Sequence, residues 1–358
     1  MMIFNSLKKK ISWRVRNFYS TIIAKYSSQI LFWSTRSPRR SSFYYFAFSN
    51  KFDREHYSVL KAKLAHINKD DNSLSFDATL RRNIHRLEKG LTTMPLRNSF
   101  AKDYIEETVS SYEFMLKSSA DFKTVKWARD VLSKYFSIVE QTSSVVKANK
   151  KFLDLEGSFK FHDTGTVPSL PFARKDSVLS DISYEQFNKL CMQRRSIRWY
   201  TQEKVPHELI DKALSATLYS PSACNRQPFR FVIIEDPEML KVAANLPMGT
   251  STFSHNIPMM AILIGDLSAY SDERDRHIIY IDGGLAAMSF MFALETLGLS
   301  SCPINWPDVE YREKSLDKFL QLSPFERCVM FISIGFPLED GQIPFSQKKS
   351  INTILSKI

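Results

Sequence analysis

A long apolar segment at residues 277–297 limits most strongly how this chain can fold. Its hydrophobic side chains fall on all sides of a helix, so several other elements must cover it. These side chains are Ile278, Ile279, Ile281, Leu285, Met288, Phe290, Phe292, Leu294 and Leu297. Short apolar runs at 229–235, 258–265 and 328–334 predict strands, and segments between them predict further helices. The C-terminal half is therefore expected to be a compact domain of helices and strands around this helix.

The residues before this domain predict a helical region. Apolar side chains recur at three- and four-residue spacing in 76–91, namely Leu80, Ile84, Leu87 and Leu91. Asp77 is placed to cap the start of this helix, and Gly90 lies near its end. Two more helices are expected at 101–118 and 122–145, whereas 41–65 begins as an aromatic-rich, irregular stretch.

The first fifty residues form a basic arm. They contain nine Lys and Arg and no Asp or Glu, which accounts for most of the net charge of +11. Aromatic residues are interleaved with these cations, a pattern that favours peripheral contact of residues 1–40 with an anionic membrane surface. A solubilising arm, or a helix docked on its own protein, fits equally well. No nucleic-acid motif accompanies the charge, so no nucleic-acid partner is expected.

Four parts follow from this organisation. They are the basic arm at 1–50, the helical region at 51–155, a Gly-, Pro- and Ser-containing linker at 156–183, and a C-terminal domain at 184–358. The four cysteines are widely separated and form no CxxC pair, which argues against a disulfide framework or a zinc ribbon and favours the cytoplasm. His85 and Glu88 lack further ligands nearby, so no metal site is predicted.

Two short runs carry the candidate chemistry. Arg194-Arg195-Ser196-Ile197-Arg198 places three guanidinium groups and a hydroxyl within five positions, enough donors to neutralise a phosphate dianion. Residues 219–229, Tyr-Ser-Pro-Ser-Ala-Cys-Asn-Arg-Gln-Pro-Phe, form a polar loop that leads into a strand. Neither GxGxxG nor GxxxxGK spacing occurs, so side chains must hold any nucleotide. The duller alternative is an exposed basic helix end.

These motifs, in this order, resemble the FMN-dependent nitroreductase family. The resemblance covers about 184–350 and includes Leu297-Gly298-Leu299 and Gly335-Phe336-Pro337. It implies an α+β fold, with a mainly antiparallel sheet flanked by helices and a long buried helix, preceded here by the α-helical N-terminal region. It also implies a homodimer with FMN at the interface.

The resemblance assigns roles residue by residue. Arg194, Arg195 and Ser196 match positions on the FMN phosphate and ribityl chain, and Arg198 matches the cation beside the flavin N1 and O2 edge. The positions on the loop that reaches the partner subunit's flavin are Pro221, Ser222, Ala223, Asn225 and Gln227. Pro303, Ile304 and Asn305 match the segment over the ring near N5. The sequence leaves open whether the bulky Trp306 that follows restricts the substrate face. Lys348 falls where the family has a cation on the phosphate.

The implied activity is ping-pong transfer of reducing equivalents from NAD(P)H through flavin N5 to a small organic acceptor. No catalytic acid, base or nucleophile is assigned, because the flavin carries the chemistry. The alternative is a flavin-binding or flavin-free scaffold that its N-terminal region recruits to a membrane or a biosynthetic complex.

Overall fold

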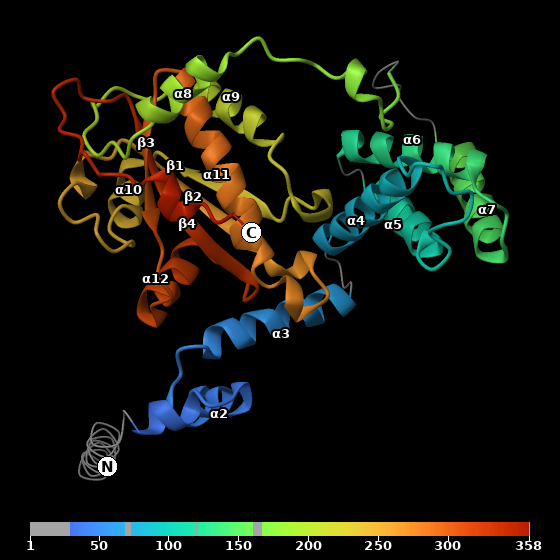
Figure 1. Ribbon diagram of the computed structural model, residues 1–358, viewed down its shortest axis with the longest axis horizontal. Coiled ribbons are helices and arrows are strands. Elements are labelled where there is room, and N and C mark those ends of the chain that lie inside the picture. The colour runs from blue at the N-terminus through green and yellow to red at the C-terminus, as the bar shows by residue number, and fades with distance from the viewer. Residues whose placement is uncertain (1–28, 69–72, 119–120, 160–166, 358) are drawn as a thin grey trace. The chain divides into compact units, whose positions relative to one another are not determined.

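The computed structural model describes residues 29–68, 73–118, 121–159 and 167–357. The chain divides into two compact units, Met1–Tyr57 and Ser58–Ile358. Figure 1 follows the chain from blue to red and labels its elements. The first 28 residues of the predicted basic arm lie outside the described residues.

The described part of the first unit is helical. Ser37 and Pro38 give a sequence signal for a helix start, and the Ser37 hydroxyl accepts a hydrogen bond from Arg40 N–H. Helix α2 spans Pro38–Phe48, and α3 spans Asp53–Asn68. The prediction of an irregular stretch at 41–65 is therefore wrong. It failed because α2 buries none of its residues, so its aromatic side chains follow no apolar stripe.

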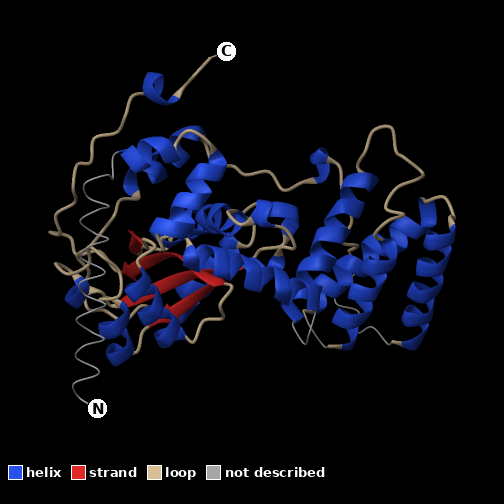
Figure 2. Ribbon diagram, turned by 90° about the horizontal axis from the view of Figure 1, so that it is seen from below, coloured by secondary structure: helices blue, strands red, loops and turns tan. Residues whose placement is uncertain are grey.

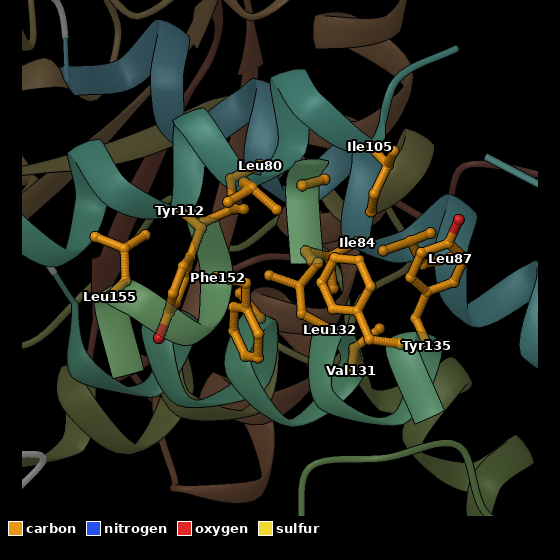
Figure 3. Packing of buried hydrophobic residues seen from close by; sticks show 14 of the residues in the cluster. Leu80, Ile84, Leu87, Ile105, Tyr112, Val131, Leu132, Tyr135, Phe152 and Leu155 are labelled. Atoms are coloured by element: carbon orange, nitrogen blue, oxygen red, sulfur yellow. The ribbon is translucent and has the colours of Figure 1, made fainter. Parts of the chain in front are cut away.

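Four helices form a bundle in the second unit: α4 Ser73–Leu91, α5 Ile105–Lys117, α6 Phe122–Ile138 and α7 Ser143–Ser158. Figure 3 shows its core, to which α4 contributes Leu80, Ile84 and Leu87. The single helix expected at 122–145 is two helices. Asp77 does not cap α4, which begins a turn earlier. Its carboxylate instead pairs with Arg81, 2.9 Å from oxygen to nitrogen.

A four-stranded antiparallel sheet forms the centre of the C-terminal part (Figure 2). Its strands are β1 Phe229–Ile234, β2 Met259–Asp266, β3 Ser300–Asn305 and β4 Glu326–Gly335, in the order β1-β2-β4-β3. The predicted α+β class with an antiparallel sheet is confirmed. The sequence missed β3, whose Pro303 is tolerated because β3 is an edge strand.

Helices cover both faces of this sheet. On one face, α9 His207–Thr217 and α11 Ile278–Thr296 pack against Ala261, Leu263 and Ile332. On the other, α10 Pro237–Ala243 and α12 Glu310–Leu320 pack against Ile262 and Phe331. Helix α11 is long and apolar enough to cross a membrane by length and composition alone. Its packing on the sheet is that of a core helix, as the sequence predicts.

Helix α4 joins the bundle to the sheet-containing part. One side of α4 lies in the bundle core, and Ala78 on another side packs with Leu267, Tyr270 and Ile279. Helix α4 also contacts the short 3-10 helix η2, Ala223–Asn225. The second unit is therefore continuous, and α4 is buried on two sides.

The loop that contains η2 has an unusual backbone. Cys224, Asn225 and Gln227 have φ values of 55°, 52° and 51°, in the left-handed region that non-glycine residues rarely adopt. The Ser222 hydroxyl accepts from Gln227 N–H at 2.7 Å, and the Asp282 carboxylate on α11 accepts from Ala223 N–H at 2.9 Å. These bonds hold the loop against α11 in a strained shape.

Replacing Asp282 tests this attachment. Asp282→Ala is expected to lower the free energy of unfolding by about 1–3 kcal/mol, because Ala223 N–H loses its acceptor. Asp282→Asn keeps an amide oxygen there and is expected to cost less.

Burial raises the pKa of the Asp282 carboxyl, against the opposing hydrogen bond from Ala223. The folded chain therefore holds this proton at a pH where the unfolded chain has lost it, so wild-type stability falls as pH rises through that window. Asp282→Asn should become relatively more stable as pH rises. Denaturant unfolding of both proteins from about pH 4 to pH 8 measures the difference. A difference independent of pH, or one of opposite slope, would contradict this assignment.

Candidate functional site

The arginine run lies beside the edge strand of the sheet. It follows α8, Tyr184–Gln193, whose start carries a capping box between Ser183 and Gln186. After α8 the chain becomes extended. Ser196 forms a bridge with Ser301, and Ile197 N–H donates to Ser301 C=O at 3.1 Å. The structure thus brings Arg194–Arg198 next to the beginning of β3.

Tyr200 ties the backbone of this run to strand β4. Its hydroxyl is buried, donates to Ile197 C=O at 2.6 Å and lies 2.8 Å from the Ser333 hydroxyl on β4. Burial raises the pKa of the Tyr200 phenol. Tyr200 is therefore a neutral structural tie, and its deep burial makes it unsuited to proton transfer.

Arg195 holds the C-terminal tail. Its guanidinium donates to Pro344 C=O at 2.7 Å and to Phe345 C=O. Lys348 follows three residues later and is exposed. The structure therefore brings the tail to the arginine run, as a shared phosphate site requires. The phosphate roles of Arg195 and Lys348 stay predictions.

Two buried polar atoms at the arginine run have no hydrogen-bond partner among the described residues. They are Arg194 Nε and Ser301 Oγ. Arg198 donates to Ser196 C=O at 3.3 Å, and its guanidinium lies 5.8 Å from the Phe253 ring centre. Buried donors without partners are costly unless a ligand satisfies them. The donor set of guanidinium and hydroxyl groups fits the phosphate and polar chain of FMN.

Glu295 on α11 lies beside Gln193 and Arg194. Gln193 Nε2 donates to its carboxylate at 3.3 Å, and the positive charge of Arg194 acts on it. Burial nevertheless raises the pKa of Glu295.

Cys302 on β3 lies near Arg198, and burial raises the pKa of its thiol against the opposing effect of the Arg198 charge. The Cys302 thiol is therefore protonated at neutral pH and is a poor nucleophile.

The segment predicted to lie over the flavin ring alternates between the two sides of β3. Ile304 is buried in the core with Cys302, whereas Pro303 is half-buried and Asn305 is exposed. Trp306 is also buried, with its indole N–H donating to Glu313 at 3.0 Å and its ring stacked on Phe331. Trp306 directly follows β3 and continues its alternation, which places the side chain in the core with Cys302 and Ile304. A role of Trp306 at the substrate face stays untested.

The polar loop lies at the other end of α11. Asp282 holds the loop at Ala223, whereas Glu295 meets Gln193 beside the arginine run. Thirteen residues separate these two carboxylates, about 20 Å along the helix axis at ~1.5 Å per residue. The structure therefore groups the predicted residues into two sets in one chain. The first holds Arg194–Arg198, Pro303–Asn305 and the tail, and the second is the loop at 221–227.

Sequence reasoning missed several residues of this arrangement. Asp282 and Glu295 were detectable as the acidic residues of an otherwise apolar helix. Ser301 and Tyr200 gave no separate signal, since their partners lie far away in the sequence. In the described part of the chain, no three His, Cys, Asp or Glu residues are placed to hold a metal ion.

Comparisons with known proteins find relatives of the C-terminal half of the chain. The model of the nitroreductase family matches residues 191–252 and 240–336. Iodotyrosine deiodinase 1 of Sus scrofa is 23% identical over 202 residues, covering 48% of this chain and 68% of the deiodinase. An NADH dehydrogenase of Thermus thermophilus is 28% identical over 181 residues, covering 42% and 86% respectively. Among solved structures, an FMN-dependent nitroreductase of Clostridium difficile has 26% identity and a TM-score of 0.38, covering 44% of this chain and 91% of that one.

The family match spans the arginine run, the strained loop, α11 and all four strands. The resemblance seen in the sequence is thereby confirmed. Through its C-terminal half, this chain belongs to the nitroreductase family.

Proposed function

We propose that the protein is an FMN-dependent NAD(P)H oxidoreductase that passes reducing equivalents to a small organic acceptor by a ping-pong mechanism. The observation that carries this proposal is the set of unused donors at Arg194 and Ser301, with Arg198 beside them. Membership of the nitroreductase family supports it, as does the name NADH dehydrogenase of the Thermus relative.

Each residue of the set has a task in this proposal. Arg194, Arg195 and Ser196 bind the phosphate and ribityl chain, and Arg198 places positive charge at the edge where reduction builds up negative charge. FMN held by these residues would supply the redox chemistry. The protein orients the reactants, so no protein nucleophile is needed.

The purified protein is expected to be yellow, with about one flavin per chain, and NADH should bleach it in the absence of oxygen. Arg194→Ala combined with Arg198→Ala should weaken flavin binding by about a hundredfold or more, because two charge-assisted interactions are lost. Arg174→Ala, an exposed position, is the control. Wild-type protein that takes up no FMN in a fluorescence titration would refute the proposal.

The two sets of site residues favour a homodimer. Asp282 and Glu295, the α11 residues beside the two sets, lie about 20 Å apart along the helix axis, and a second copy that supplies the loop would let both sets meet one flavin. The exposed side of α11 also carries large apolar side chains that a partner would cover: Tyr280, Ile281, Leu285 and Met288. A second copy of this chain is the occupant that satisfies both observations.

The wild type is expected to have about twice the 41.5 kDa mass of one chain in solution. Ile281→Glu with Leu285→Glu should give a monomer that has also lost its flavin, because charges would be buried in the interface. Leu153→Glu, at an exposed site on α7, should stay dimeric. Light scattering after size exclusion measures the masses. A flavin-loaded wild-type monomer would rule out the shared site.

For the basic arm we propose peripheral contact with the cytoplasmic face of a membrane. Phe43 and Phe46 of α2 are 51% and 87% exposed. The guanidinium of Arg40 lies 5.0 Å from the Trp33 ring centre. Exposed aromatic and cationic side chains, in a segment (29–50) whose sequence contains no Asp or Glu, match an anionic lipid surface.

Vesicle sedimentation tests this contact with the full chain. Binding is expected to vesicles containing about a third phosphatidylserine, and not to pure phosphatidylcholine. Phe43→Ser with Phe46→Ser should reduce the affinity about tenfold or more, because the membrane would no longer bury two aromatic rings. Leu153→Ser on the bundle is the control. Equal binding to both vesicles, or none to either, would contradict the proposal.

A further inference from the structure

Arg82 and Arg86 lie one turn apart on α4, the helix that contacts the strained loop. Helix α4 contacts η2, and Arg82 is close enough to Arg226 for their positive charges to act on each other. Arg82 donates to Asn83 Oδ1 at 3.1 Å and to Glu107 Oε2 at 3.3 Å. The Arg86 guanidinium, one turn further along, lies 3.7 Å from the Tyr104 ring centre.

Arg226, a residue of the loop, lies near Arg82. Its guanidinium lies 4.7 Å from the Tyr270 ring centre. Its Nε is buried and has no hydrogen-bond partner among the described residues. Arg226 directly follows Asn225, one of the residues held in the left-handed region. Arg82, Arg86 and Arg226 are called the arginine cluster below.

The arginine cluster carries more positive charge than its neighbours neutralise. Glu107 pairs with Arg82, and the Asp282 charge acts on Arg226 while its carboxylate already accepts from Ala223 N–H. Arg86 and Arg226 lie on aromatic faces, which offer weaker compensation than a carboxylate. Burial lowers the pKa of Arg82, and the charges of Arg226 and Arg86 lower it further against the effect of Glu107.

Such crowding of like charges is unfavourable in an empty site and becomes favourable when an anion enters. Planar guanidinium groups bind carboxylates and phosphates through paired hydrogen bonds. Here the donors for such hydrogen bonds are Arg226 Nε and the N–H groups of Arg82 that do not bind Glu107.

We propose that Arg82 and Arg226, supported by Arg86, bind the anionic group of a reactant at the flavin site. The inference rests on the proposed function, because the loop at 221–227 is expected to border the flavin of the neighbouring subunit. The anionic group is a carboxylate of the electron acceptor or the extra phosphate of NADPH. The bundle thereby acts as the part of the protein that selects the reactant.

Matched reactants separate the two sources. The acceptors are 4-nitrobenzoate and 4-nitrobenzamide, which differ in one negative charge, and the donors are NADPH and NADH. In Arg82→Gln and, separately, in Arg226→Gln, the kcat/KM ratio of nitrobenzoate to nitrobenzamide is expected to fall about tenfold if the acceptor carries the anion. If NADPH carries it, the NADPH to NADH ratio falls instead. Lys147→Gln, the same charge change at an exposed site of the bundle, should alter neither ratio.

A binding measurement makes the test independent of turnover. Inorganic phosphate, compared with chloride at equal ionic strength, should raise the thermal midpoint of the wild type and of Lys147→Gln more than that of the Arg82→Gln, Arg226→Gln double variant. Equal phosphate effects together with unchanged ratios in both single variants would overturn the arginine cluster as an anion site. Failure of the proposed function is a different result, since wild-type protein would then bind no flavin.

Discussion

The seating of α11 on the sheet determines where every part of the candidate site lies. This helix has no polar face, so the sheet and α9 must cover it, and its remaining apolar side needs further cover. Close approach is possible because Gly265 on β2 has no side chain. A Cβ there would come within 2.7 Å of the Ile279 Cβ. The two acidic residues of α11 then have fixed positions, with Asp282 under the loop and Glu295 beside the arginine run. A rotation of α11 by one residue, about 100°, would separate both from their partners.

The sequence predicted the parts of the fold that depend on apolar runs. The strands β1, β2 and β4 and helix α11 are such runs, and each was expected within a few residues of its observed ends. The missed elements are those without a periodic apolar pattern in the sequence. Strand β3 begins Ser300-Ser301-Cys302-Pro303, and α12 buries only Glu313 and Leu316 among its residues. Neither has a periodic apolar signal.

The candidate site shows the same limit. Grouping Arg194 with Ser196 and Arg198 required only that they be neighbours in the chain, and the structure keeps them together. The environment of Trp306 required knowledge of β3. In a strand, alternate residues face opposite sides, so Trp306 shares the buried side with Ile304 and Cys302. Without the strand, the family resemblance left open whether this large side chain lies at the substrate face.

Helix α4 changes what the N-terminal helices contribute. The linker composition at 156–183 suggested that the bundle and the family domain are separate bodies, but Ala78 of α4 packs in one cluster with Tyr270 and Ile279. The aromatic ring of Tyr270 also carries Arg226, so the packing of α4 and the position of the loop's arginine depend on the same residue. Under the proposed anion site, a reactant that fixes Arg226 would therefore also stabilise the contact of α4 with Tyr270. The bundle and the loop at 221–227 share this contact, although about 140 residues of sequence separate Arg82 from Arg226.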